Sequence, residues 1–417
     1  MGESAAGRAP AIVRDAPEQL CLFCREGGFK SVHVVADLNT WAALGESATG
    51  QLRKAGIDVT STVFDRSVRA DASALGELLL DDDGGRRLFV AVGSGTITDI
   101  VRYYAHRRGM PFVSLPSAPS VDAYTSTVAA LMINGAKRTV AAGTPAAVFG
   151  DLDVLCAAPR AMIAAGFGDM ICKFTALADW RLGALLWGEP WDDAIARRMR
   201  HAAEDCAQAA PAIATGSPEG VATLMRGLLE SGKAMTEAGH SRPASGAEHH
   251  YSHFWEMRLM DEGRPPVLHG LKVGVATVMT AGLWERIRDV GRTELEGLLA
   301  AARFPDAEAG ARAIRGDFGA AAEEVIAAHD RFLSLGAADC GALKSAIRNN
   351  WDEIAALAAS VPRAEEIARL LASAGCPAIP RELGLGEDDV AAARRSAHYL
   401  RDRFTIAKLA GFLHVEG

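Results

Sequence analysis

Histidines gather in one short stretch of the chain, where their spacing could serve a metal ion. Four of the eleven histidines fall within 21 residues, where an even spread would place roughly half of one. They are His249, His250, His253 and His269. His249 and His253 are four residues apart and share one face of a helix, whereas His250 points elsewhere. His269 follows a turn-forming segment, Asp261–Pro266, and opens a second predicted helix. The pattern predicts imidazoles from two neighbouring helices at one site.

Asp169 is the carboxylate that could complete such a site. It stands among glycines and apolar residues in AGFGDMICK, near a predicted helix start. An acid in these surroundings is costly to bury unless a positive group meets it, and a divalent ion would meet that need. Asp169, His249 and His269 would leave open positions for substrate oxygens, and this donor set suits zinc, nickel and iron alike. The alternatives are that Asp169 caps a helix and that the histidines are surface or core residues satisfied by hydrogen bonds.

A glycine-rich turn predicts a site for a phosphate group. Gly93-Ser94-Gly95-Thr96-Ile97 follows an apolar strand and precedes a predicted helix. Glycines let the backbone approach a phosphate closely, and the N–H groups of the helix start point at the anion. Thr96 and Asp99 also have the spacing of a helix capping box. Taken alone, the turn could be only a tight connection.

Two further segments favour a dinucleotide at this turn. Asp37 ends the strand SVHVVAD, where a carboxylate could accept hydrogen bonds from a ribose diol and, by repelling a 2′-phosphate, favour NAD over NADP. Asp37 could equally cap the helix that begins at Asn39. The loop Ser114–Asp122 follows the next strand and would lie beside the glycine turn. Its small hydroxyl side chains suit adenine and ribose, although surface loops share this composition.

The first third of the chain must position these segments, and it alternates between strand and helix character. Four short segments rich in Val, Ile or Phe are separated by stretches of helix length. They are Ser31–Ala36, Asp58–Phe64, Arg87–Val92 and Pro111–Leu115. This rhythm predicts a parallel sheet covered on both faces. Asn134-Gly135, between Thr127–Ile133 and Lys137–Ala141, predicts a hairpin added to that sheet, and a last strand is expected near Ala147–Leu152.

From about Ala158 the pattern becomes helical. Apolar residues recur at helical spacing in Ala194–Ala210, Glu294–Ala302 and Ala364–Ala374. We predict a loose N-terminal tail over residues 1–17, an α/β Rossmann-like dinucleotide-binding domain over 18–157 and an all-helical metal- and substrate-binding domain over 158–417. A cleft between the two domains is the expected place for a ligand.

The composition excludes several classes of protein. The chain has 417 residues, of which 49% are hydrophobic, enough for two cores, and its net charge of −8 predicts no nucleic-acid partner. The sequence contains no run of about 18 uninterrupted apolar residues, so we expect no membrane-spanning helix. The N-terminus lacks the apolar core of a signal peptide. Seven scattered cysteines, including a CxxC at Cys21 and Cys24, suit a reducing cytoplasm better than a disulfide framework or a zinc knuckle.

Five segments resemble the sn-glycerol-1-phosphate dehydrogenases, particularly their bacterial branch. The segments are GSGTITDI, LPSAPSVDAYTS, AGFGDMICK, SRPASGAEHHYSHFWEM and HGLKVGV. The resemblance runs in order from about residue 30 to RDRFTIAKLAGFL and covers nearly the whole chain. The block around Ser241–Met257 is specific, whereas the glycine turn is shared widely. This family belongs to the superfamily of iron-type alcohol dehydrogenases, glycerol dehydrogenases and dehydroquinate synthases, and the resemblance implies a dehydroquinate synthase-like fold.

The resemblance also implies a function and partners. It implies the interconversion of dihydroxyacetone phosphate and sn-glycerol 1-phosphate with NAD(H) or NADP(H). It further implies a homodimer and one divalent metal per site, zinc in archaeal members and nickel in bacterial ones. One departure is Ala123, where the family pattern has glycine, and this residue could narrow the loop beside the substrate.

Site residues follow from the same resemblance. The dinucleotide would contact the glycine turn and a second set of residues, Leu115, Pro116, Ser117, Ala118 and Ser126. Asp122, Asp169 and His253 would face the substrate. Asp169, His249 and His269 would hold the metal.

A Lewis-acid mechanism agrees with both lines of reasoning. One carboxylate and two neutral imidazoles leave a divalent ion with net positive charge, which would stabilise negative charge on a ketone oxygen. His253 would relay the proton, or only support the ligands. Arg242, seven residues before His249, is the first candidate for binding the substrate phosphate, and Lys173 and Lys137 are the next candidates.

Three rival functions stay open. The first is a dehydroquinate-synthase-like cyclase, a lyase that recycles NAD within one turnover. The second is a dehydrogenase of the same type for a different phosphorylated or phosphonate ketone. The third is a binding or regulatory protein that has lost catalysis.

Overall fold

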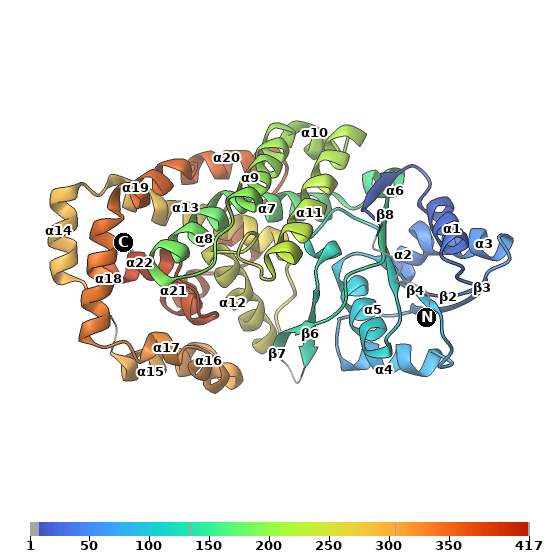
Figure 1. The fold of residues 1–417 in the computed structure, drawn as a ribbon, viewed down its shortest axis with the longest axis horizontal. Coiled ribbons are helices and arrows are strands. Elements are labelled where there is room, and N and C mark those ends of the chain that lie inside the picture. Colours follow the sequence, from blue (N-terminus) through green and yellow to red (C-terminus); the bar gives the residue numbers. More distant parts are fainter. Residues whose placement is uncertain (1–7, 134–135, 305, 416–417) are drawn as a thin grey trace. The chain divides into compact units, whose positions relative to one another are not determined.

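Contacts within the chain divide it into two units. The computed structural model describes residues 8–133, 136–304 and 306–415 (Figure 1). The first unit contains the chain up to Gly166 together with Gln208–Glu237, and the second contains Phe167–Ala207 and Ala238–Gly417. The limits predicted for the two domains, residues 18–157 and 158–417, stay a prediction.

A six-stranded parallel sheet forms the centre of the first unit (Figure 1). Its strands lie in the order β1-β8-β5-β4-β2-β3. They are β1 (Ala11–Val13), β2 (Ser31–Asp37), β3 (Asp58–Phe64), β4 (Leu88–Gly93), β5 (Phe112–Pro116) and β8 (Ala147–Asp151). Every residue of β4 is buried, as expected of a strand covered on both faces. The predicted alternation of strands and helices is confirmed.

Helices cover both faces of this sheet because its strands are apolar on both sides. Val34 and Val90 face a cluster with α1 (Ala16–Glu26) and α3 (Glu46–Lys54). Val35 and Phe89 face a second cluster with α4 (Ala72–Asp81) and α5 (Gly95–Arg108). The other helical segments are α2 (Leu38–Thr40), η1 (Trp41–Gly45), η2 (Ala123–Thr125), α6 (Leu152–Ala157), α10 (Ala210–Thr215) and α11 (Pro218–Ala238).

Two sequence predictions about this unit are wrong. The sequence predicts a loose tail over residues 1–17, but Ala11–Val13 pair in parallel with β8 and Asp15 caps α1. A three-residue edge strand is too short to show the periodicity that identifies longer strands. The hairpin of β6 (Val128–Ile133) and β7 (Ala136–Ala141) is antiparallel but forms its own two-stranded sheet instead of extending the parallel one. Its expected turn, Asn134-Gly135, lies outside the described residues.

The described residues of the second unit form helices and no strands. Its longer helices include α8 (Lys173–Trp187), α9 (Asp193–Gln208), α12 (Ala247–Asp261) and α13 (His269–Asp289), and α7 (Arg160–Ile171) enters it at Phe167. The remaining segments are α14 (Arg292–Ala301), α15 (Ala307–Asp317), η3 (Gly319–Ala321), α16 (Ala322–Ala328), α17 (Asp330–Leu333), α18 (Ala337–Asn349), α19 (Trp351–Ser360), α20 (Ala364–Ser373), η4 (Pro380–Leu383), α21 (Glu387–Ser396), η5 (Ala397–Tyr399) and α22 (Ile406–Leu413).

One helical stretch among the described residues is long and apolar enough to cross a membrane. It runs over Arg160–Trp187, and 89% of its most apolar window is buried inside the structure. Burial of this extent is typical of a core helix, and the stretch contains a buried acid and base, Asp169 and Lys173.

A buried guanidinium ties α5 to the loop that follows β5. Arg102, on α5, is fully buried and donates from Nη1 to Asp99 Oδ1 at 2.9 Å and to the Val128 carbonyl at 3.1 Å. Its Nη2 donates to the carbonyl oxygens of Ala123, at 2.6 Å, and Tyr124, at 2.9 Å. One side chain therefore fixes η2 and the start of β6 against the helix that follows the glycine turn.

We expect Arg102→Leu to destabilise the protein by about 3–5 kcal/mol, because it removes a buried ion pair with Asp99 and the hydrogen bonds to three carbonyl oxygens. Denaturation in urea would measure the loss. Arg107→Leu, at an exposed position of the same helix, is the matched control and should change stability by less than about 0.5 kcal/mol. Equal stability of the two variants would contradict the clamping role of Arg102.

Candidate functional site

Three helices of the second unit bring Asp169, His249 and His269 together. Asp169 lies on α7, His249 on α12 and His269 at the first residue of α13. Their ligand atoms all lie within 4.8 Å of one another, and His249 Nε2 is 3.7 Å from Asp169 Oδ1. The two imidazole centroids are 5.3 Å apart. These separations suit one ion, because metal bonds of roughly 2 Å place neighbouring ligand atoms about 3–4 Å apart.

Close packing of two backbones explains how Asp169 meets His269. A Cβ added at Gly168 would lie 2.3 Å from the carbonyl oxygen of Gly270, and one at Gly274 would lie 3.3 Å from Gly168 Cα. Helices α7 and α13 therefore touch at residues adjacent in sequence to the two ligands, which only glycine permits. The sequence places Asp169 near a helix start, and this is wrong, because it lies two residues before the end of α7 at Ile171. It is not a helix cap.

Lys173 supplies a positive group to buried Asp169. Both residues have 0% exposure, and Lys173 Nζ lies 3.6 Å from Asp169 Oδ1. The ammonium also donates to the Ala244 carbonyl at 3.1 Å. The cost of burying Asp169 is thus partly offset within the chain, by a lysine that the sequence analysis considered for the substrate phosphate.

Glu248, which the sequence analysis missed, contacts Nδ1 of His249, whereas Asp169 faces Nε2 of the same ring. Glu248 Oε1 is 2.9 Å from His249 Nδ1 and accepts the Gly246 N–H at 2.6 Å. Burial alone would raise the pKa of Glu248, but the hydrogen bonds from His249 and the backbone outweigh it and hold the pKa below its usual value. The sequence could have indicated this role, because Glu248 is an acid that directly precedes the predicted ligand His249.

His253 lies one turn after His249 on the same face of α12, as the four-residue spacing predicts. Its ring centroid is 6.0 Å from that of His249 and 5.2 Å from that of His269. Its Nδ1 is 3.4 Å from Glu256 Oε2, an oxygen that is also 3.6 Å from Lys272 Nζ. His253 therefore borders the three-ligand group, with a carboxylate that can hold its ring.

The glycine turn lies at the carboxyl end of β4 and the start of α5. A Cβ at Gly93 would lie 2.7 Å from Ile97 Cβ, so the turn leaves no room for a side chain there. The predicted capping box of Thr96 and Asp99 is wrong, because Ser94 is the N-cap, makes no side-chain hydrogen bond, and Asp99 pairs with Arg102. The amides of the first turn thus receive no side-chain cap, which suits an anion.

The loop after β5 lies beside this turn, as predicted. Pro116 is in register with Gly93, and the Ser117 N–H donates to the Gly93 carbonyl at 3.2 Å. Leu115 and Ala118 are buried around it. The strand register therefore places both predicted cofactor segments at one edge of the sheet.

Other predicted residues of the first unit have defined partners. Asp122 Oδ2 accepts the Ser231 hydroxyl at 2.7 Å, and the Ser126 hydroxyl oxygen accepts the Val128 N–H at 3.1 Å. Asp37 caps α2 in a capping box with Thr40, which confirms the capping alternative. Its role toward a ribose stays a prediction.

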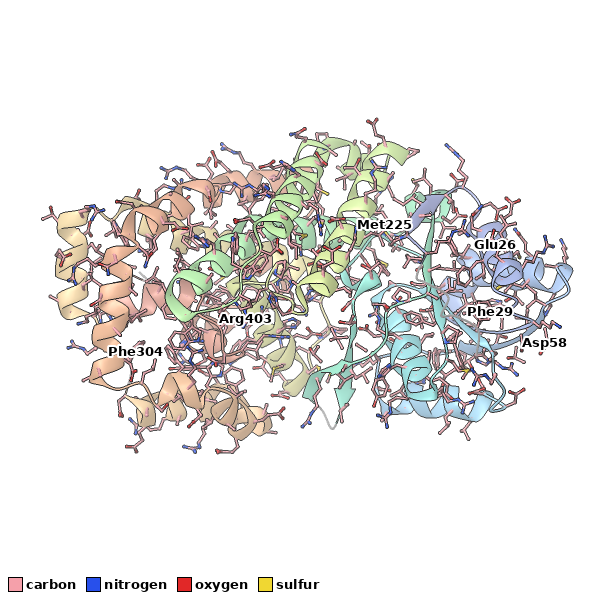
Figure 2. The ribbon with its side chains drawn as sticks, viewed as in Figure 1. Glu26, Phe29, Asp58, Met225, Phe304 and Arg403 are labelled. Atoms are coloured by element: carbon pink, nitrogen blue, oxygen red, sulfur yellow. The ribbon has the colours of Figure 1, made fainter. Side chains whose placement is uncertain are left out.

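Arg242, the first choice for a phosphate, is paired within the chain. Its Nε lies 2.5 Å from Glu189 Oε2. A second arginine, Arg403, was missed in the sequence analysis; Figure 2 labels it among the side chains of the helical region. It donates hydrogen bonds to the Ser245 carbonyl and the Ser241 hydroxyl, at 2.8 Å each, and so holds the loop that contains Arg242. The side chain of Lys137 lies outside the part of the chain that the structure describes.

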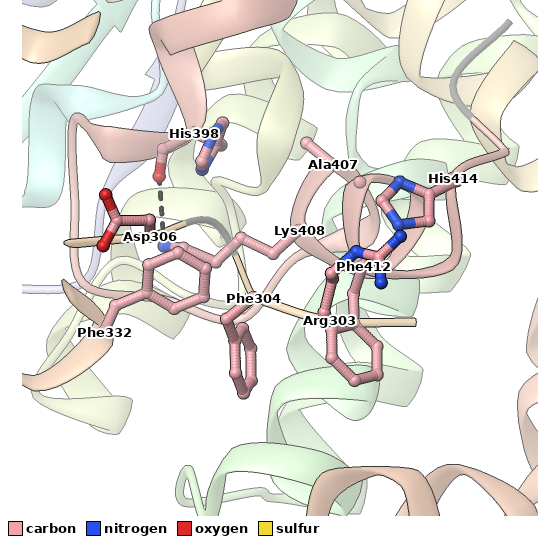
Figure 3. A pocket seen from close by; sticks show the side chains of 10 residues that line it. Arg303, Phe304, Asp306, Phe332, His398, Ala407, Lys408, Phe412 and His414 are labelled. Atoms are coloured by element: carbon pink, nitrogen blue, oxygen red, sulfur yellow. Dashed lines mark hydrogen bonds between the residues drawn. The ribbon is translucent and has the colours of Figure 1, made fainter. Parts of the chain in front are cut away.

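A cavity of about 420 Å³ in the second unit lies apart from the predicted site residues. It is lined by Arg303, Phe304, Asp306, Phe332, His398, Ala407, Lys408, Gly411, Phe412 and His414 (Figure 3). Lys408 Nζ already donates to the His398 and Arg403 carbonyls, at 3.0 and 2.8 Å. The Lys408 amino group therefore serves the fold rather than an open binding surface, and burial lowers its pKa to about 7.

Comparison with known proteins gives consistent matches. The sequence pattern of the iron-containing alcohol dehydrogenase family matches residues 11–159. The chain is 35% identical over 410 residues to a glycerol-1-phosphate dehydrogenase (NAD(P)+) of Bacillus velezensis, covering 96% of this chain and 91% of that protein. It is 36% identical to a protein of the same name from Bacillus subtilis, over 94% and 88% of the two chains.

Solved structures show the same fold. A glycerol dehydrogenase from Schizosaccharomyces pombe superposes with a TM-score of 0.65 at 18% identity, covering 98% of this chain and 89% of that one. The 1,3-propanediol oxidoreductase structure gives a TM-score of 0.63 at 15% identity and covers all of both chains. These likenesses confirm the predicted combination of a Rossmann-like sheet and a helical region.

The three-ligand group predicts that Asp169→Asn will lose its bound divalent ion, because an amide supplies no negative charge to attract the ion and Lys173 Nζ stays nearby as a positive group. Metal analysis after loading with Ni²⁺ and dialysis would show about one ion per wild-type chain and almost none in the variant. Asp261→Asn, at the exposed end of α12, is the control and should keep its ion. A full complement of metal in the Asp169 variant would exclude it as a ligand.

Proposed function

This chain belongs to the glycerol-1-phosphate dehydrogenase family, and we propose that it interconverts dihydroxyacetone phosphate and sn-glycerol 1-phosphate with NAD(P)(H). The observation that carries the proposal is the grouping of Asp169, His249 and His269 in a chain that matches its relatives over nearly their whole length. A secondary alcohol is oxidised, or its ketone reduced, at one carbon atom. The chain must therefore bind the dinucleotide, orient the ketone and handle one proton.

The donor set of the three-ligand group fits a divalent ion. One carboxylate and two neutral imidazoles carry a single negative charge, so the loaded site is positive, and zinc, nickel and iron all accept these ligands. When bound, such an ion stabilises the negative charge that develops on the ketone oxygen. Lys173 Nζ lies 3.6 Å from Asp169 Oδ1 and helps to hold this carboxylate in place.

We assign the proton to His253. The ring stands beside His249 and His269, and Nδ1 faces the carboxylate of Glu256 at 3.4 Å. A carboxylate at Nδ1 holds the ring in one orientation and stabilises its protonated form, as general acid catalysis requires. His253 Nε2 then delivers the proton to the substrate oxygen during reduction and removes it during oxidation. Asp122, held by the Ser231 hydroxyl, is assigned to the substrate by family resemblance.

We assign the dinucleotide to the glycine turn and the neighbouring loop, and reduced nicotinamide supplies the hydride. The first-turn amides of α5, over Gly95–Ile97, bind the pyrophosphate, which the small Gly93 lets approach the backbone. Leu115–Ala118 and Ser126 line the adjacent surface. Asp37, at the end of β2, contacts the ribose with the carboxylate that also caps α2.

Arg242 remains our choice for the substrate phosphate. Its Nε is paired with Glu189, but a guanidinium has five N–H donors in a fork, so it can bind an acid and a phosphate together. Glu189 then orients the fork. We further propose a homodimer in the cytoplasm, in line with the family resemblance and with seven cysteines that are all free.

The purified protein, loaded with Ni²⁺ or Zn²⁺, should oxidise NADH or NADPH when given dihydroxyacetone phosphate. The product should be sn-glycerol 1-phosphate, which a dehydrogenase specific for the opposite enantiomer leaves untouched. If NADH or NADPH is oxidised only with other phosphorylated or phosphonate ketones, the protein is a dehydrogenase for one of those substrates instead. No net consumption with any ketone would favour the cyclase, which returns its hydride within one turnover.

Arg242→Ala should raise KM for dihydroxyacetone phosphate by roughly 10–100-fold, the loss expected for a charge-assisted hydrogen bond, and leave KM for dihydroxyacetone nearly unchanged. Steady-state kinetics with both ketones would measure this. Arg181→Ala removes an arginine that is likewise paired with a glutamate, Glu353, and serves as control. Equal changes with both ketones would reject the phosphate role.

A further inference from the structure

His249 presents two ring nitrogens to two different carboxylates. Nε2 lies 3.7 Å from Asp169 Oδ1, and Nδ1 lies 2.9 Å from Glu248 Oε1. A neutral imidazole carries its proton on one nitrogen only, and a metal ligand must offer the other. The tautomer of His249 therefore decides whether the three-ligand group can bind an ion.

We propose that Glu248 is the positioning residue that sets this tautomer. Its carboxylate accepts the Nδ1 proton, so that Nε2 offers its lone pair on the side of Asp169. A carboxylate in this place also makes the imidazole a stronger electron donor. The proposal rests on the metal site of the proposed function but is independent of the substrate.

The surroundings of Glu248 hold it rigidly in this position. The side chain is completely buried, and its Oε2 lies 2.9 Å from the Thr175 hydroxyl on α8. A Cβ at Gly246 would lie 2.9 Å from the same oxygen and 2.6 Å from Asp179 Oδ2, so a side chain there would displace both acids. Rotation of the His249 ring about its Cβ–Cγ bond would break the hydrogen bond from Nδ1 to Glu248. A carboxylate that is held in place therefore also holds the ring in one orientation.

The geometry does not favour Glu248 as a ligand in its own right. Ligand atoms of Cys172, Glu248 and His249 also lie within 4.8 Å of one another. However, the oxygen nearest to His249 accepts the Gly246 N–H at 2.6 Å, and its 2.9 Å distance to Nδ1 is that of a hydrogen bond. Cys172 Sγ is 4.0 Å from Nδ1 and 3.1 Å from the Asp169 carbonyl. Nδ1 therefore faces an acceptor, and the ion belongs on the Nε2 side.

A simpler role for Glu248 would be to stabilise the start of α12 by accepting the Gly246 N–H. That role and the proposed one differ in what they control. A structural acid affects the free energy of unfolding of the metal-free protein, whereas a positioning acid affects the dissociation constant of the ion.

The test is the affinity of the full-length, metal-free protein for Ni²⁺, measured by competition with a chelator of known affinity. Glu248→Gln keeps the shape but loses the charge, and its amide can donate to Nδ1 and favour the wrong tautomer. We expect its dissociation constant for Ni²⁺ to rise about 10- to 100-fold. Thr175→Val removes only the hydroxyl behind Glu248 and should give a smaller rise. The absorption spectrum of bound Co²⁺ should change in the Glu248 variant.

Ser252→Ala is the matched control, because Ser252 is also fully buried on α12 but belongs to none of the groups of possible metal ligands. Its Ni²⁺ affinity should equal that of the wild type. A Glu248→Gln variant that loses stability in urea while its Ni²⁺ affinity stays within twofold of the wild type would overturn the proposal, as would an equal loss of affinity in Ser252→Ala. A wild type that binds Ni²⁺ but reduces no ketone would refute the proposed function, while the Glu248 result would still stand.

Discussion

The close contact between α7 and α13 at Gly168 and Gly270 is the constraint on which the rest of the second unit's site depends. The two backbones meet where a single Cβ would lie 2.3 Å from a carbonyl oxygen. Because a ligand follows one glycine and precedes the other, this contact sets the distance between Asp169 and His269. Helix α12 then adds His249 and His253 from one face. A shift of α7 by the width of one methyl group would move Asp169 relative to both His249 and His269.

Charge balance explains how such a site folds around buried ionisable groups. Asp169, Lys173 and Glu248 have no exposed surface, and each unpaired charge in that environment would cost several kcal/mol. The chain pairs them in advance: Lys173 with Asp169, and Glu248 with the N–H groups of His249 and Gly246. An ion that binds here joins a prepared network, so little reorganisation opposes it.

The periodicity of apolar residues and the spacing of histidines predicted the fold and the central residues of the candidate site. They could not predict which side chains pair with one another. Helical spacing correctly placed His249 and His253 on one face, and apolar runs located the strands. No pattern reports that Lys173 pairs with Asp169, or that Asp99 pairs with Arg102 instead of capping α5. Such choices depend on which groups tertiary packing leaves within reach. The three residues of β1 were missed because they show no period at all.

The two candidate sites differ in the chemical groups that they offer, and this accounts for the uneven specificity of their motifs. The glycine turn offers backbone amides, which any sequence supplies provided Gly93 leaves room for the approach. Such a turn therefore recurs in many unrelated nucleotide-binding proteins. The block Ser241–Met257 instead depends on side chains that position one another. Gly246 leaves room for the carboxylate of Glu248, and Glu248 holds the ring of His249. Each link needs one residue type at one position, so this block is the more specific of the two motifs.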